Sequence, residues 1–374
     1  MRAYQTEHFV GRAGKLDCAV IVPILNEVAN IEQLLRRLNV ALSDLEAEII
    51  FVDDGSTDGS AELVEAIAAE DEKVRLIRRI GRRGLSSAVV EGFLSTVAPV
   101  VAVIDGDMQH DESALPKLIS AVLSGESDLA VGTRYADGGS VGTWSEDRVK
   151  ISRMATRLAG SVMKTPLSDP MSGFFAIRRS EILEVAPRLS QTGYKILLDI
   201  VASHPNRLKV AEVPYEFRSR TAGESKLDSA VALEFFELLL EKSLGQFLPA
   251  KLIIFGAIGL LGTVVHLALL AASLKSFGLV FAAAQGIATL GAMTFNYTLN
   301  NTLTYRDRKR TGARWLTGWL SFCAACSLGA IANIGIGTML FMESQSWWIS
   351  GLAGAIVGSV WNYVATSWFT WRNK

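Results

Sequence analysis

Cysteine is scarce in this chain of 374 residues, which has three: Cys18, Cys323 and Cys326. Three cysteines form no paired framework, so we expect no disulfide-stabilised fold. Cys323 and Cys326 have C-x-x-C spacing, but they lie in an apolar run without a second pair of ligands. Small buried helix residues are the better interpretation. Residues 1–15 are polar and predict no cleavable signal peptide.

Two common phosphate-binding signatures are missing. No G-x-G-x-x-G follows the first expected strand, so the dinucleotide-binding fingerprint is absent, and no G-x-x-x-x-G-K-[ST] occurs, which disfavours an ATPase. Neither sign of charge is in excess, because 37 Lys and Arg residues face 38 Asp and Glu residues. This balance predicts no nucleic-acid partner.

Charge is nearly absent from the last third of the chain. Asp, Glu, Lys and Arg do not occur in four segments: 252–274, 277–299, 315–341 and 348–370. A helix of roughly 20 residues crosses the hydrocarbon core of a bilayer. We therefore expect residues 250–374 to form a domain of four transmembrane helices.

The joints between these segments predict their orientation. Basic residues gather in the joint 305–314 and in the C-terminal WRNK, whereas the alternate joints carry only Lys275 and Glu343. Lys and Arg favour the cytoplasmic side of a membrane. We expect an integral, multi-pass membrane protein whose two termini and N-terminal domain are cytoplasmic.

The tail also repeats itself. Residues 295–307 align with 361–373, and residues 261–266 align with 328–333, which predicts a duplicated helix pair in parallel orientation. Polar residues occupy matching places in the copies: His266, Asn296, Asn333 and Asn362. Hydrogen bonding between helices is the simpler interpretation of these residues, and a substrate route is the sharper one.

The first 226 residues alternate short apolar strands with helical patterns, which is typical of an α/β fold with a mostly parallel sheet. Ligands bind such sheets beyond the carboxyl ends of the strands. Three expected strands end in potential ligand groups: Asn26 and Glu27, Asp53 and Asp54, Asp105 and Asp107. These carboxylates suit Mg²⁺ or Mn²⁺, which commonly bridges protein to a substrate diphosphate.

Asp53 or Asp54 is placed to hydrogen-bond a nucleobase or ribose. Basic residues follow further along the chain: Arg134, Arg148, Lys150, Arg153, Arg218, Arg220 and Lys226. Each one is explained as an ordinary surface residue, as a phosphate ligand, or as a contact to anionic lipid.

An ordered set of motifs gives the chain a family resemblance. P-x-x-N-E, VDDGSTDGS, DGDMQHD, GTRY, DPMSGFFAIRR, GYKILLDI and R-x-x-GESK occur between residues 18 and 226. This set resembles family 2 glycosyltransferases of the GT-A fold, above all dolichyl-phosphate mannose synthases and their bacterial polyprenyl-phosphate relatives. The tail resembles GtrA-like membrane domains. We expect an N-terminal tail (1–15), a GT-A domain (16–226), an amphipathic region (227–249) and the membrane domain (250–374).

The resemblance implies roles for individual residues. It assigns the metal to Asp105, Asp107 and Gln109, and the donor phosphates to Arg220 and Lys226. The nucleotide pocket would comprise Pro23, Asn26, Glu27, Val52, Asp53, Asp54 and Asp105. The acceptor phosphate would be held by Arg134, Arg148 and Ser152, and the catalytic set would be Asp107, Arg134, Arg220 and Lys226. Leu25 and Asp199 depart from the family pattern, which has an aromatic residue and Glu there.

The expected activity is that of an inverting, metal-dependent hexosyltransferase. It would move mannose from GDP-mannose to a dolichyl or undecaprenyl monophosphate at the cytoplasmic leaflet, using Mg²⁺ or Mn²⁺. We name no catalytic base, because a phosphate acceptor is already anionic. The alternatives are a UDP-glucose-dependent enzyme, a processive polysaccharide synthase and a lipid-linked sugar flippase. Residues 227–248 would form an interfacial helix or pack against the catalytic domain.

Overall fold

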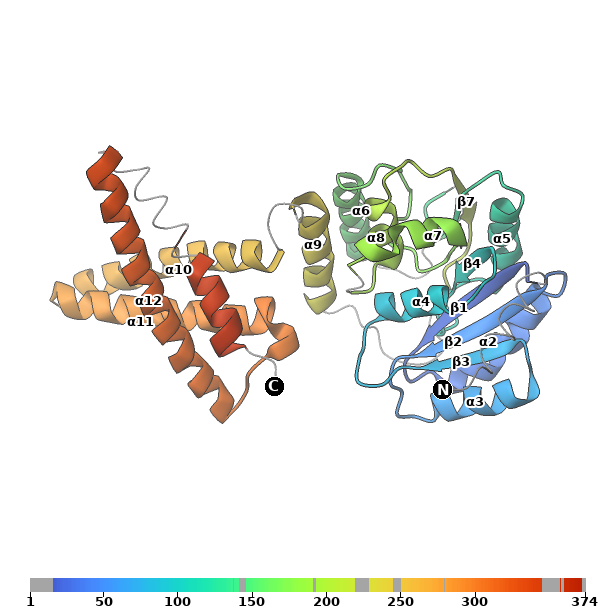
Figure 1. Ribbon diagram of the computed structural model, residues 1–374, viewed down its shortest axis with the longest axis horizontal. Helices are drawn as coiled ribbons and strands as arrows, with labels where there is room; N and C mark the ends of the chain where they lie inside the picture. The colour runs from blue at the N-terminus through green and yellow to red at the C-terminus, as the bar shows by residue number, and fades with distance from the viewer. Residues whose placement is uncertain are drawn as a thin grey trace. The chain divides into compact units, whose positions relative to one another are not determined.

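The computed structural model describes residues 16–136, 138–140, 146–190, 193–218, 229–244, 250–278, 280–344, 357 and 360–371. The chain divides into two compact units, Met1–Ser243 and Leu244–Lys374 (Figure 1). The boundary falls near the point where charge disappears from the sequence.

A seven-stranded sheet forms the centre of the first unit, in the order β3-β2-β1-β4-β6-β5-β7. Every pairing is parallel except those of β6, which is antiparallel to both of its neighbours. The predicted mostly parallel α/β sheet is therefore confirmed. The strands are β1 (Cys18–Ile24), β2 (Ala47–Asp53), β3 (Val74–Arg78), β4 (Val100–Val103), β5 (Leu129–Thr133), β6 (Phe175–Arg178) and β7 (Val210–Pro214).

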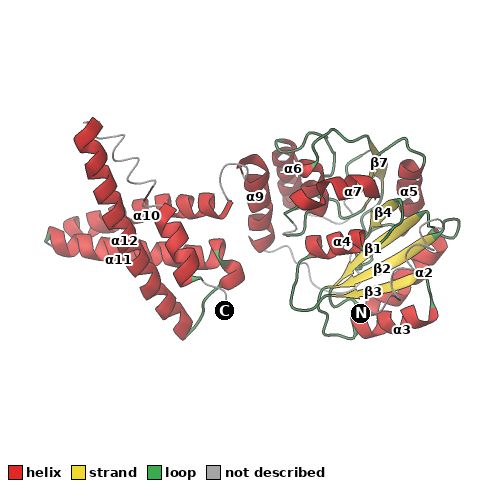
Figure 2. Cartoon of the chain, viewed as in Figure 1, coloured by secondary structure: helices red, strands yellow, loops and turns green. Residues whose placement is uncertain are grey.

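Helices cover both faces of this sheet (Figure 2). Successive side chains of a strand point to opposite faces, so Val20 of β1 packs in one apolar core and Ile21 in the other. The first core includes α2 (Val28–Ala41), α3 (Ser60–Glu70) and α5 (Leu115–Leu123), and the second includes α4 (Leu85–Leu94), α7 (Arg179–Val185) and α8 (Ile196–Ser203). Short 3₁₀ turns add η1 (Glu112–Ala114) and η2 (Ala186–Arg188).

The helix α9 (Ser229–Leu244) packs against the rest of the first unit. Its Leu238 and Leu239 share a buried cluster with Leu198 of α8 and Ala159 of α6 (Glu146–Gly160). Of the two interpretations of residues 227–248, packing against the domain is observed for this helix, and the interfacial role stays a prediction.

A buried ion pair fixes α9 in place. The Nζ of Lys242 lies 2.6 Å from Oδ1 of Asp199 on α8, and both side chains are buried. Asp199, where the family pattern has Glu, therefore holds a neighbouring helix.

The second unit is helical. It contains α10 (Ala250–Lys275), α11 (Phe281–Leu299), the π-helical turn η3 (Asn300–Thr304), η4 (Arg306–Arg308), α12 (Ala313–Ser344) and a second π-helical turn, η5 (Thr366–Thr370). The first three apolar segments coincide with α10, α11 and α12, whereas residues 348–356, 358 and 359 of the fourth segment lie outside the described residues. Within the described part of the chain, α10 is the one helix long and apolar enough to cross a membrane.

The two π-helical turns confirm the register of the internal repeat. Tyr305 ends the first turn at φ −118° and ψ 38°, and its equivalent Trp371 ends the second at φ −117° and ψ 35°. The two aromatic rings stack on each other, with centroids 4.1 Å apart and planes 9° from parallel. Equivalent residues of the two copies thus meet in the core of this unit.

Candidate active site

The carboxyl ends of β1 and β2 are joined by hydrogen bonds between their turns. The backbone N–H of Asn26 donates to Ser56 Oγ at 2.9 Å, and Thr57 N–H donates to Asn26 Oδ1 at 2.9 Å. The N–H of Glu27 donates to Ser60 Oγ at 2.9 Å. Asn26 has a positive φ of 60°, which asparagine tolerates better than most residues. The two motifs P-x-x-N-E and DDGSTDGS therefore form a single surface, with Asn26 exposed at the edge of the sheet.

The two aspartates at the end of β2 lie inside this surface. The Asp53 carboxylate accepts from Gly55 N–H at 3.1 Å and from Ser56 N–H, and so closes its own turn. Asp54 pairs with the buried guanidinium of Arg79 and accepts from Gly84 N–H at 2.8 Å. Pro23 and Val52 are also buried, within β1 and β2. Of the expected nucleotide residues on β1 and β2, Asn26 and the half-buried Glu27 are the more accessible.

The predicted metal ligands follow strand β4, at the same edge of the sheet. Asp105 and Asp107 follow the strand, and Asp107 Oδ1 accepts from the N–H of Gln109 at 3.2 Å. Met108, between Asp107 and Gln109, has φ 65°. Met108 and Asn26 are the two non-glycine residues with positive φ in the described part of the chain. Strained backbone of this kind concentrates at functional sites.

Arg218 fastens the loop that carries these ligands. Its N–H donates to the Gln109 carbonyl at 2.9 Å, and Gln109 Nε2 donates back to the Arg218 carbonyl at 3.2 Å. The guanidinium donates to Asp111 at 2.8 Å and to Glu112 at 2.7 Å. Arg218, two positions before the R-x-x-GESK motif, is thus engaged with carboxylates and lies beside the loop that carries the predicted metal ligands.

His110 lies behind Asp105 in a cage of aromatic rings. Its Nε2 is 3.1 Å from Asp105 Oδ2, and its ring centroid lies 5.1 to 5.7 Å from those of the aromatic cage, Phe174, Tyr215 and Phe217. Burial lowers the pKa of His110 to about 4, although neighbouring Asp107 opposes the shift. A neutral imidazole results, and it donates through Nε2 because a carboxylate only accepts.

Arg134 lies inside the protein. Its Nε and Nη2 donate to the two carboxylate oxygens of Asp169 at 2.7 and 2.8 Å, and Arg134 is 8% exposed while Asp169 is 0% exposed. The guanidinium carbon also lies 5.3 Å from the ring centroid of Phe217, and Asp169 raises the pKa of Arg134 against the effect of burial. The resemblance assigns Arg134 to the acceptor phosphate, but in the structure this bidentate pair engages it.

Ser152 of the expected acceptor site contacts Tyr135, the residue that follows Arg134. The Tyr135 hydroxyl donates to Ser152 Oγ at 2.7 Å, which connects the GTRY motif to α6. Arg148 is one turn earlier on the same helix, and residues four apart lie on one helix face. The side chain of Arg148, and Arg220 and Lys226 as a whole, lie outside the described residues.

Comparison with known proteins matches both units of the chain. Residues 19–185 match the glycosyl transferase family 2 domain, and residues 254–371 match the GtrA/DPMS transmembrane domain. A dolichol-phosphate mannosyltransferase of Pyrococcus furiosus is 33% identical over 363 residues, which are 94% of this chain and 99% of that protein. The chain belongs to glycosyl transferase family 2.

Two further relatives match a shorter part of this family 2 glycosyltransferase. The dolichol-phosphate mannosyltransferase of Saccharomyces cerevisiae is 38% identical over 249 residues, 64% of this chain and 92% of that protein. The protein of the same name from Mycosarcoma maydis is 40% identical over 232 residues, 60% of this chain and 78% of that protein. The glycosyltransferase class and its GtrA/DPMS transmembrane domain are thereby confirmed.

Three residues that hold the site were given no role by the sequence reasoning: His110, Arg79 and Asp169. His110 and Asp169 stand within quoted family motifs of this glycosyltransferase, so they were visible as motif letters. Their partners Asp105 and Arg134 could be found only from the fold, because Asp169 lies 35 residues from Arg134 along the chain.

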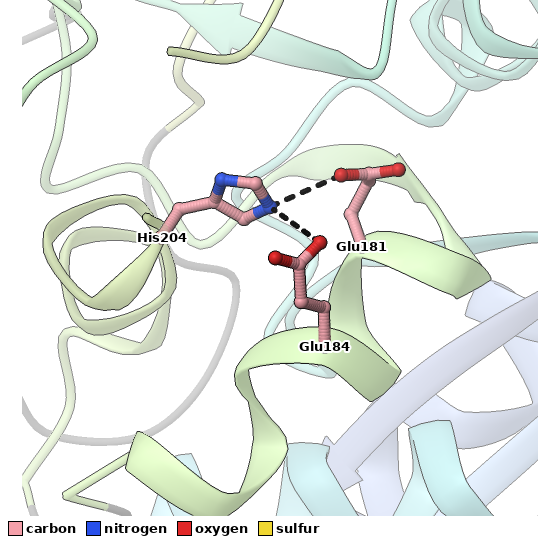
Figure 3. Close-up of side chains that lie close together, drawn as sticks. All are labelled: Glu181, Glu184 and His204. Carbon is pink, nitrogen blue, oxygen red and sulfur yellow. Dashed lines mark hydrogen bonds and ion pairs between the residues drawn. The ribbon is translucent and has the colours of Figure 1, made fainter. Parts of the chain in front are cut away.

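A second group of ligand-type side chains lies at the opposite edge of the glycosyltransferase sheet. Glu181, Glu184 and His204 place one ligand atom each within 4.8 Å of one another (Figure 3). They lie on or near α7, which begins beside the amino end of β4, since Arg178 pairs with Val100. His204 Nε2 lies 3.0 Å from Glu181, whose carboxylate only accepts, and Nδ1 lies 3.0 Å from the carbonyl oxygen and 3.2 Å from the backbone nitrogen of Asn206. The protonated Nε2 therefore donates to Glu181. This hydrogen bond explains the proximity of the three side chains as a structural contact.

Proposed function

We propose that this chain transfers mannose from GDP-mannose to a polyisoprenyl monophosphate, dolichyl or undecaprenyl, with inversion at the anomeric carbon. The observation that carries the proposal is the likeness to the Pyrococcus furiosus dolichol-phosphate mannosyltransferase, which extends through the catalytic unit and the tail. The arrangement of side chains at the carboxyl edge of the sheet supports the same chemistry.

The residues after β4 fit a hard divalent cation. Asp105, Asp107 and Gln109 offer oxygen atoms, the ligand type that Mg²⁺ and Mn²⁺ prefer. The Nε2 of Gln109 donates to a backbone carbonyl, so the amide oxygen is the atom that it would offer. When bound, the cation supplies positive charge to the diphosphate of the donor.

The joined turns of β1 and β2 supply the proposed nucleotide surface. Asn26 and Glu27 would contact the donor, while Asp53 and Asp54 keep the surface in shape through Gly55, Ser56 and Arg79. Pro23 and Val52 would form its apolar floor. These assignments make the contribution of Asp54 indirect.

The acceptor phosphate would approach from α6, where Arg148 and Ser152 share a face. Arg220 and Lys226 would face the donor phosphates. Arg134 would act through Asp169 as a positioning residue. The acceptor oxygen is already anionic at neutral pH, so no side chain has to remove a proton from it, and direct displacement gives a β-linked product from an α-linked donor.

The membrane arrangement follows the distribution of basic residues. The joint 305–314 and the C-terminus carry Lys and Arg, which favours the cytoplasmic side for both. Four membrane helices would then return the chain to the side on which the catalytic unit lies. In this arrangement the polyisoprenyl chain would stay in the bilayer while its phosphate reaches Arg148 and Ser152 at the cytoplasmic leaflet.

The test is a transfer assay with the purified full-length chain, Mn²⁺, undecaprenyl phosphate, and GDP-mannose or UDP-glucose in parallel. We expect an organic-soluble β-linked mannosyl lipid with GDP-mannose and no turnover after chelation by EDTA. Asp107→Asn should lower kcat/KM by about 100-fold or more, whereas Asp44→Asn, at an exposed carboxylate, should not change it. Turnover with UDP-glucose alone would contradict the proposed donor, and an α-linked product would contradict inversion.

A further inference from the structure

Two residues to which the family resemblance gave no role, His110 and Gly173, lie next to the carboxylate of Asp105. His110 Nε2 lies 3.1 Å from Asp105 Oδ2. On the other side, a Cβ added at Gly173 would lie 3.0 Å from Oδ2 and 3.3 Å from Oδ1. The position of Asp105 therefore depends on a donor at residue 110 and on the absence of a side chain at residue 173.

His110 is itself fixed by its surroundings. It is 4% exposed, and Phe174, Tyr215 and Phe217 surround its ring. Its Nδ1 is buried and meets no hydrogen-bond partner among the described residues. Among the described residues, the imidazole thus makes its hydrogen bond to Asp105, so the ring is a donor aimed at that carboxylate.

The aromatic cage connects this donor to the rest of the site. Phe217 contacts the guanidinium of Arg134 at 5.3 Å, and Phe174 belongs to the DPMSGFF motif that also supplies Asp169 and Gly173. The segments after β4, before β6 and after β7 therefore meet at the ring of His110. A buried ring that receives contacts from three segments is suited to holding a single side chain in one orientation.

We propose that His110, with Gly173, is a positioning residue that orients the Asp105 carboxylate for the divalent cation. The inference rests on the proposed function, because Asp105 matters in this way only if the site binds a metal ion. Partners that orient metal ligands typically contribute about 10–100-fold to metal affinity. Loss of the His110 donor should therefore weaken the binding of the cation without altering the fold.

The experiment measures Mn²⁺ binding by electron paramagnetic resonance of the purified full-length chain, with Mn²⁺ alone and with Mn²⁺ and GDP. His110→Phe keeps an aromatic ring in the cage and removes the donor, and should raise the Kd for Mn²⁺ by about tenfold or more. His110→Gln retains a nitrogen donor and should restore much of the affinity. Gly173→Ala should also weaken binding, because its methyl group presses on Asp105.

His204→Phe is the matched control, because it removes a buried imidazole bonded to a carboxylate at the opposite edge of the sheet. It should leave the Kd for Mn²⁺ unchanged. A folded H110F or a folded G173A with the wild-type Kd would overturn the positioning role. Absence of Mn²⁺ binding by the wild type would overturn the metal site and this inference together, whereas mannose transfer is assayed separately.

Discussion

Arg134 and Asp169 show how one residue pair determines the inner wall of the site. Moving a charged group out of water costs several kcal/mol unless a partner and hydrogen bonds compensate for it. Here the bidentate geometry supplies both, and Asp169 is completely buried. The pair joins the GTRY and DPMSG motifs, so its loss should disturb two walls of the site at once.

We predict that Asp169→Asn lowers the free energy of unfolding by about 3–5 kcal/mol, because the buried guanidinium loses its counter-charge. Thermal unfolding of the detergent-purified chain, followed by circular dichroism, measures the effect. Glu62→Gln removes one partner of the exposed Arg78 pair and should leave the unfolding midpoint unchanged. Equal midpoints for the wild type and D169N would show that this pair contributes little.

At the residue scale, the sequence predicts which strand ends carry ligands and which atoms they offer. Apolar strands that end in Asp105, Asp107 and Asn26 required no structure to be recognised, because parallel strands present their carboxyl ends at one edge. The sequence did not predict that Asp54 turns towards Arg79, or that His110 is enclosed by rings more than 60 positions away in the chain. Such contacts depend on tertiary packing, which periodicity does not reveal.

Among the elements, α9 best illustrates how a helical pattern can leave its surroundings undecided. Its leucines and acidic residues fit an interfacial helix and a domain-packed helix equally well. The structure shows packing through Leu238, Leu239 and the Lys242–Asp199 pair, while Phe236 remains exposed, so the interfacial role stays a prediction. The chain leaves the catalytic unit through a helix that is anchored to α8.

We predict that Lys242→Met weakens the attachment of α9, because it removes the ammonium that pairs with the buried Asp199, and breaking a buried ion pair costs about 3–5 kcal/mol. Hydrogen exchange should show loss of protection in residues 229–244 before the sheet is affected. The double variant with Asp199→Leu should recover most of the protection, since a well-packed apolar pair can replace a buried ion pair. Unchanged exchange in K242M would contradict the anchoring role.

For the whole molecule, the sequence predicted the boundary between a charged part and a nearly uncharged part, and it also predicted the repeat within the tail. Alignment of residues 295–307 with 361–373 correctly paired Tyr305 with Trp371. The alignment did not predict that these two rings would stack on each other, because sequence similarity gives equivalence and says nothing about distance.

We predict that Trp371→Ala destabilises the membrane unit by about 3–5 kcal/mol, the usual cost of truncating a large buried aromatic residue. Trp371 is 0% exposed and stacks on Tyr305, whereas Trp368, three positions earlier, is 72% exposed. Trp368→Ala is therefore the matched control and should leave thermal stability in detergent unchanged. Similar losses of thermal stability in both variants would mean that the Tyr305–Trp371 stack does not contribute specifically to stability.

The contact between Tyr305 and Trp371 has the character of an isologous interface within one chain. In a symmetric dimer, the residue on the two-fold axis meets its own copy, so one side chain must be complementary to itself. A flat aromatic face satisfies that condition, and the tail has an aromatic residue at this position in both copies. Fusing two such halves in one polypeptide releases the position from self-complementarity, and a tyrosine can then face a tryptophan.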